Sequence, residues 1–183
     1  MAPEREAPVY VLPYDLKWPA LFETERALLA NALRPWLRGS IEHMGSTAVT
    51  GMPAKPVIDI MAGVESLEAS RSALNVLGEL GYVYAPYRTD VMHWFCKPSF
   101  AERTHHLHLV PFRSLVWDER LGFRDCLRSD PAVAHEYAAL KYHLAEIHRL
   151  DREAYTDAKG AFIGRVLDTV RIRRPRFANQ RAA

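Results

Sequence analysis

The sequence has 183 residues, of which 49% are hydrophobic and 25% are charged. This composition is typical of globular proteins and excludes a disordered or fibrous chain. The formal net charge of +2 is too small to indicate a nucleic-acid-binding protein, and the two cysteines exclude a disulfide framework of the secreted kind. There is no signal-peptide pattern and no apolar run of the roughly 18 residues that cross a bilayer, so we expect a cytoplasmic protein without membrane or nucleic-acid partners.

The length of the chain fits one domain. Residues 1–8 are rich in proline and charge and predict a flexible N-terminal arm, whereas residues 173–183 are rich in arginine and predict a basic, disordered tail. A single domain is therefore expected over residues 9–172. The sequence does not indicate an oligomeric state.

The first half of this domain alternates between helical and strand-like patterns. Apolar residues recur at helical spacing before Pro35, and shorter runs with alternating or continuous apolar residues follow. The expected elements are a helix from Trp18 to Leu37, strands at Ile41–Met44 and Pro56–Val64, a helix at Leu67–Leu80 and a strand at Tyr82–Tyr84.

The second half begins with two extended segments, Met92–Lys97 and His105–Phe112, which a polar, turn-forming stretch separates. We expect these two segments to pair antiparallel. Long periodic segments of good helix formers follow, and Asp130–Pro131 has the pattern of an N-cap with proline at the first helical position. Three C-terminal helices are expected, at Leu115–Leu127, Pro131–Leu150 and Thr156–Arg173.

The segment from His43 to Asp59 contains the first candidate functional residues. The backbone of Gly45, Ser46 and Thr47 follows a predicted strand and is suited to cradle a phosphate group, although a tight turn is the simpler interpretation. Asp59 stands inside an apolar strand, where a carboxylate requires a partner or a metal. Lys55 precedes the same strand, so a cation and a carboxylate meet near one sheet edge, as a phosphate site or as a salt bridge.

Histidines supply the second group of candidates. His106 and His108 are two residues apart on a predicted strand and therefore point the same way. Together with Asp59, and with His43 or Glu42 nearby, they form a ligand set for a divalent metal such as zinc, iron or manganese. The alternative is a polar strand face that is hydrogen-bonded to its neighbours. Arg103, just ahead of this strand, is placed to bind an anionic ligand.

Several separated motifs resemble the GrpB-like family, which belongs to the nucleotidyltransferase superfamily. The resemblance covers about residues 9 to 170. It rests on Glu42–Val49, on Gly51, Ala54–Pro56 and Ile58–Ile60, and on Arg103–Leu109, Tyr137–Leu144 and Lys159–Ile163. The resemblance implies an α/β (α+β) fold, in which a nucleotidyltransferase-like mixed sheet is flanked by helices and followed by a helical C-terminal part.

The superfamily pattern continues from Gly-Ser to an acid, an apolar residue and a second acid, and it takes divalent magnesium. Gly45, Ser46 and Asp59 match this pattern, but Met61 occupies the position of the second acid. A thioether does not hold a hard magnesium ion, whose preferred ligands are oxygen atoms. The departure shifts the expected chemistry towards the histidines.

Three functions follow as hypotheses. The first is a nucleotidyltransferase-like enzyme that acts on a nucleotide or on another phosphorylated or carboxylated small molecule, with Asp59, His106 and His108 supplying a metal site or a general base. The second is a metal-dependent biosynthetic enzyme without nucleotidyl transfer. The third is a non-catalytic module that binds a nucleotide or another small ligand.

Overall fold

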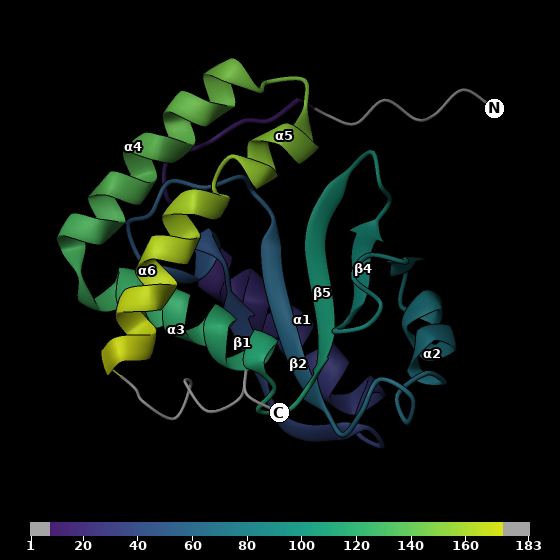
Figure 1. The fold of residues 1–183 in the computed structure, drawn as a ribbon. Coiled ribbons are helices and arrows are strands. Elements are labelled where there is room, and N and C mark those ends of the chain that lie inside the picture. The colour runs from purple at the N-terminus through teal and green to yellow at the C-terminus, as the bar shows by residue number, and fades with distance from the viewer. Residues whose placement is uncertain (1–7, 174–183) are drawn as a thin grey trace.

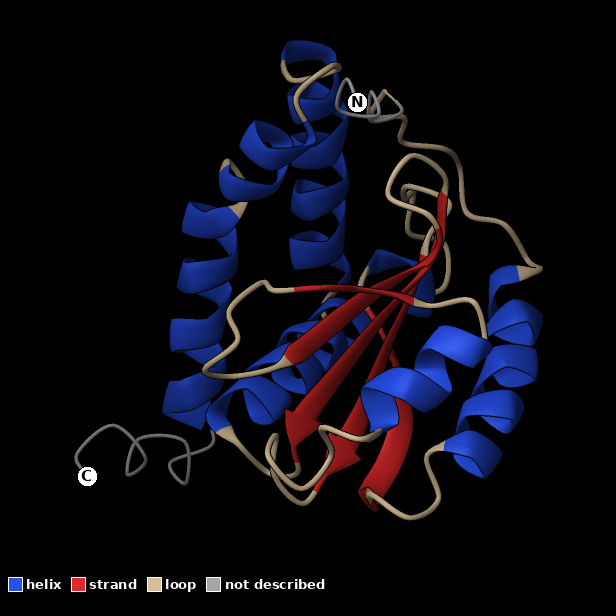
Figure 2. Cartoon of the chain, turned by 90° about the vertical axis from the view of Figure 1, so that its right-hand side faces the viewer, coloured by secondary structure: helices blue, strands red, loops and turns tan. Residues whose placement is uncertain are grey.

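The computed structural model describes residues 8–173 and contains one mixed sheet with helices on both faces (Figures 1 and 2). The strands lie in the order β1-β2-β5-β4-β3. Strands β2 and β5 run parallel to each other, whereas the other neighbouring pairs are antiparallel. The strands are β1 (Leu37–Met44), β2 (Ile58–Val64), β3 (Val83–Ala85), β4 (His93–Pro98) and β5 (Arg103–Pro111).

Strand β2 is almost continuously apolar because it lies between two other strands and is covered on both faces. Its side chains alternate between the faces. Ile58 and Ile60 join a buried cluster with α1 (Trp18–Ala32) and α2 (Ala73–Glu79). Met61 packs on the opposite face against Val116 and Trp117. Asp59 shares the face of Met61, so it points away from α1 and towards the helices of the second half of the chain.

The helices of the second half pack beside this face (Figure 1). They are α3 (Leu115–Ser129), α4 (Pro131–Ile147), α5 (Arg152–Asp157) and α6 (Gly160–Arg173). Helix α4 begins as the sequence predicts, because the Asp130 carboxylate accepts hydrogen bonds from the backbone N–H groups of Ala132 and Val133. Tyr137 of α4 and Phe162 of α6 stack on each other and pack against Val49 and Met52, which follow the short 3-10 helix η1 (Ser46–Ala48).

Three predicted helices differ from the structure. The helix expected from Trp18 to Leu37 ends at Ala32, ahead of Pro35, and Leu37 begins β1. The helix expected at Thr156–Arg173 is interrupted, because Asp151 caps an earlier helix, α5, and the chain restarts only at Gly160, a poor helix former. The helix expected at Leu67–Leu80 is shorter, because the Ser70 hydroxyl bonds back to the carbonyls of Ser66 and Leu67 and stabilises turns ahead of α2.

The expected mixed α/β fold class is confirmed, as is the antiparallel pairing of β4 with β5. Apart from Pro8 and Arg173, the predicted N-terminal arm at residues 1–8 and the predicted basic tail at residues 173–183 lie outside the described residues. Between residues 8 and 173, none of the helices has the length and apolar character that a membrane span requires.

Candidate functional site

The centre of the site is a contact between Asp59 on β2 and His106 on β5. The two residues are paired in the parallel register, and His106 Nδ1 lies 2.9 Å from Asp59 Oδ1. Opposite a carboxylate oxygen, this nitrogen is the donor. Exposure of the side chain is 13% for His106 and 29% for Asp59, so solvent or a ligand reaches the carboxylate more easily than the imidazole.

The environment of Asp59 keeps its side chain ionised. Burial alone raises the pKa of a carboxyl group, but the hydrogen bond from His106 and the positive charges around the site outweigh it. The net effect lowers the pKa of Asp59 well below its usual range. The carboxylate is therefore negatively charged throughout the neutral range.

The Gly45–Ser46 turn packs directly on this carboxylate. Gly45 has a φ of +71°, and a Cβ atom added there would lie 2.4 Å from Asp59 Oδ2. Only glycine combines this backbone conformation with such a close approach. The glycine of the predicted phosphate turn therefore has a defined role, which is to admit the Asp59 side chain.

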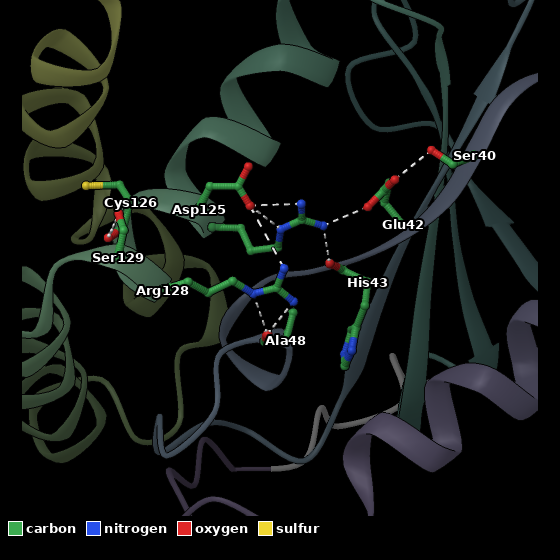
Figure 3. A network of polar contacts seen from close by, with 9 residues as sticks. Ser40, Glu42, His43, Ala48, Asp125, Cys126, Arg128 and Ser129 are labelled. Atoms are coloured by element: carbon green, nitrogen blue, oxygen red, sulfur yellow. Dashed lines mark hydrogen bonds and ion pairs between the residues drawn. The ribbon is translucent and has the colours of Figure 1, made fainter. Parts of the chain in front are cut away.

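Two arginines of α3 hold this turn in place (Figure 3). Arg124 Nη1 donates to Glu42 Oε2 at 2.8 Å and to the carbonyl oxygen of His43 at 2.9 Å. Arg128 donates to the carbonyl oxygen of Ala48 through Nε at 3.0 Å and Nη2 at 2.7 Å. These bonds fix the backbone on both sides of Gly45. The Glu42 carboxylate accepts one of these bonds, so it helps to position the turn.

Three cationic side chains from separate segments act on Asp59. Lys55, Lys159 and Arg120 each interact electrostatically with its carboxylate. The ammonium groups of Lys55 and Lys159 lie 4.9 and 4.3 Å from the centre of the same Tyr155 ring. Burial lowers the pKa of Lys55 to about 7 and that of Lys159 to about 8, and the positive charge of Arg152 acts in the same direction on both.

The other predicted phosphate-binding residues have different positions. Ser46 hydrogen-bonds the Tyr137 side chain. The Thr47 hydroxyl is buried, contacts His43 and donates to the carbonyl oxygen of Val57 at 3.3 Å, so it does not face a ligand. Arg103 lies at the start of β5 with its guanidinium 5.5 Å from the centre of the Trp94 ring. Of these residues, Ser46 and Arg103 remain candidates for ligand contact.

The structure does not bring together the four predicted metal ligands. His43 is paired with Ile60 and therefore lies on the α1 face of the sheet, where its ring stacks on Phe22 at 4.6 Å. His108 shares the face of Asp59, but its Nδ1 contacts the sulfur of buried Met92 at 3.4 Å. Burial and the nearby Arg120 hold the pKa of His108 well below its usual range.

The donor set does not fit a pair of magnesium ions, because Met61 stands where a second carboxylate is required and the charged neighbours of Asp59 are histidines and cations. Within residues 8–173, no three His, Cys, Asp or Glu side chains form a group that could hold a metal ion. Divalent-metal binding stays a prediction.

Sequence reasoning missed the residues that come from the C-terminal helices. Arg120 lies on α3, Lys159 precedes α6 and Tyr155 lies on α5, far from Asp59 in the sequence. A lysine or arginine on a predicted helix is usually solvated, so composition and spacing gave no signal for these residues. The motif Lys159–Ile163 of the family resemblance was the one available indication.

Comparisons with known proteins agree with this architecture. The family model described as GrpB protein matches residues 8–169. A glutamate-rich protein GrpB of Alkalihalophilus pseudofirmus is 36% identical over 87% of this chain and 94% of its own length. A crystal structure of the conserved protein GrpB from Enterococcus faecalis superposes with a TM-score of 0.80 at 31% identity, over 88% of this chain and 96% of that one.

A further relative has a different name. A dephospho-CoA kinase of Mycolicibacterium paratuberculosis is 42% identical over 84% of this chain, which spans only 44% of that protein. The match of the family model over nearly all described residues, together with the similar fold, decides the classification. The chain belongs to the GrpB family.

Proposed function

We propose that the site around Asp59 binds a small molecule through a phosphate or carboxylate group and transforms it with the Asp59–His106 pair as the acid–base unit. The class of reaction is group transfer to or from the anionic group, as expected for a nucleotidyltransferase-like enzyme. A nucleotide or another phosphorylated compound is the favoured substrate.

The observation that carries this proposal is the excess of positive charge. Asp59 contributes one negative charge, whereas Lys55, Lys159 and Arg120, from three separate segments, contribute positive charge. Partly buried cations repel one another and are stabilised by a negatively charged ligand. Ammonium and guanidinium groups are the usual partners of phosphate and carboxylate oxygens.

The Asp59–His106 pair supplies the acid–base function. Because Nδ1 donates to the carboxylate, the neutral ring has its lone pair on Nε2. Nε2 is buried and has no hydrogen-bond partner among the described residues. A buried acceptor without a partner is costly. A ligand hydroxyl or amine that donates to Nε2, once the side chains that cover this atom move, would remove that cost. As that group attacks the phosphorus atom of the bound substrate, Nε2 accepts its proton and Asp59 stabilises the resulting imidazolium. The bond from phosphorus to the leaving oxygen breaks, and the imidazolium returns the proton to that oxygen.

The dephospho-CoA kinase relative gives independent support. That protein contains a segment similar to this chain beside a further part of comparable length. Its name refers to an enzyme that acts on a phosphorylated, nucleotide-like compound. A site for phosphorylated small molecules in this chain is consistent with that association.

Calorimetry with inorganic phosphate and a panel of nucleotides tests the binding step. Lys159→Gln and Arg120→Gln are each expected to weaken binding about tenfold, the loss of one charge-assisted contact. Lys17→Gln removes an exposed lysine that precedes α1, the helix on the sheet face opposite Asp59, and is expected to change nothing. Equal affinities in all four proteins would contradict the assignment.

Turnover tests the acid–base step. Once a ligand that binds is found, His106→Gln is expected to reduce turnover at least about a hundredfold while leaving the affinity for phosphate within about threefold. Asp59→Asn is expected to reduce turnover equally without weakening phosphate binding, because it removes a negative charge from the site. The second candidate is a non-catalytic module, which the loss of the second acid at Met61 favours. Ligand-induced thermal stabilisation without turnover of any compound that binds would support this module instead.

A further inference from the structure

A cavity of about 230 Å³ lies beside the site, at the edge of the sheet where the parallel strands β2 and β5 begin. Arg103, Arg152 and Lys55 line it together with apolar groups of Tyr10 and Leu12. A water molecule occupies about 30 Å³ of liquid, so this cavity has room for a group of several heavy atoms. Three cationic side chains on one small cavity indicate an anionic occupant.

Lys55 connects this cavity to Asp59. It lines the cavity, and it interacts electrostatically both with Asp59 and with Arg103 and Arg152. The Trp94 ring makes a second connection, because it contacts the His106 ring at 5.1 Å and the Arg103 guanidinium at 5.5 Å. The cavity and the Asp59–His106 pair are therefore neighbouring parts of one cationic region.

We infer that the cavity is a second anion subsite, with Lys55 shared between the two subsites, so that the substrate carries two anionic groups. One group lies near Lys159 and Arg120 at the Asp59–His106 pair, and the other lies between Arg103 and Arg152. This inference rests on the proposed function and narrows its substrate class to diphosphates or to compounds with one phosphate and one carboxylate.

The geometry favours two groups over one. The cations that line the cavity differ from those beside Asp59, except for Lys55. A single phosphate bound near Asp59 would not use the positive charge of Arg103 and Arg152 in the cavity. A ligand with two linked anions gains the second interaction without a further loss of translational freedom, and its affinity rises accordingly.

The test is calorimetry with inorganic phosphate, pyrophosphate and phosphonoacetate in buffer that contains a chelator. Pyrophosphate or phosphonoacetate is expected to bind at least about tenfold more tightly than phosphate. Preference for pyrophosphate would identify a diphosphate substrate, and preference for phosphonoacetate a phosphate with a carboxylate. Arg152→Gln and Arg103→Gln are each expected to reduce this advantage about fivefold or more.

Arg38→Gln is the matched control, because Arg38 is exposed on β1 at the opposite end of the sheet, in an ion pair with Glu65. Thermal melts check that each variant is folded. Two results, each with phosphate bound through Lys159, would show that the second subsite is wrong and would leave the proposed function standing. In the first, pyrophosphate and phosphonoacetate bind no more tightly than phosphate. In the second, they bind more tightly, but Arg103→Gln and Arg152→Gln both retain the tighter binding. If none of the three probes binds, both proposals are overturned.

Discussion

Replacing Gly45 by alanine tests how the site is built. The backbone there has φ +71° and ψ −169°, a region open almost only to glycine, and the new Cβ would lie 2.4 Å from Asp59 Oδ2. The backbone strain costs about 1–3 kcal/mol. The displaced carboxylate also loses its charge-assisted hydrogen bond with His106, which adds about 1.5–3 kcal/mol.

Gly51→Ala is the matched control, because Gly51 also has a positive φ, +78°, but an added Cβ would meet nothing within 4 Å. Urea denaturation of both variants is expected to show Gly45→Ala less stable than Gly51→Ala by about 1.5–3 kcal/mol, the cost of moving Asp59. In an Asp59→Ala background the difference is expected to shrink, since the closest contact is gone. Equal destabilisation by the two substitutions in the wild-type background would refute the close packing of Gly45 on Asp59.

Four further outcomes are expected. Sulfate, whose charge is constant, should bind about tenfold more weakly as the pH rises from 6 to 9, because Lys55 and Lys159, with pKa values of about 7 and 8, lose their charge; a flat calorimetric profile would contradict this. Burial lowers the pKa of His43 to about 4, so as the pH falls the unfolded chain binds a proton at this histidine before the folded protein does. Up to about 3 kcal/mol of unfolding free energy that is present above pH 6.5 should therefore be lost as the pH falls to 4. In urea titrations, His43→Gln should lose correspondingly less stability over this pH range than the wild type. Arg124→Met should cost about 2–3 kcal/mol of unfolding free energy, against no more than about 0.5 kcal/mol for Arg26→Gln in an exposed pair; similar costs would mean that the arginine does not hold the turn. The affinity for sulfate should be the same with and without a chelator in the buffer. Zinc, manganese or magnesium bound in stoichiometric amount to the wild type and lost in a His106→Gln variant would instead support the predicted metal site.

Much of the sheet could be predicted because its signals are local. The apolar run around Asp59 indicated β2, and the alternation of His106 and His108 correctly placed both on one strand face. Strand β1 is longer than predicted and begins at Leu37, in a region without clear alternation. There Gly39 admits the Phe112 ring, whose atoms would lie 2.3 Å from an added Cβ, and such a contact between distant segments leaves no local pattern.

The site was only partly predictable for the same reason. Asp59 and His106 meet because the two strands are neighbours in a register that the residues alone do not specify. The same register places His43 on the opposite face, although it precedes the Gly-Ser turn by only two residues. Lys159 and Arg120 reach Asp59 through the packing of α3, α5 and α6, which depends on the tertiary structure.

The most direct measurement is a crystal structure of the protein soaked with tungstate, a strongly scattering anion. An anomalous peak is expected within hydrogen-bond reach of the Lys159 ammonium and the Arg120 guanidinium, beside the Asp59–His106 pair. Peaks confined to other surfaces, with this region occupied by water alone, would contradict the claim that the site binds an anion.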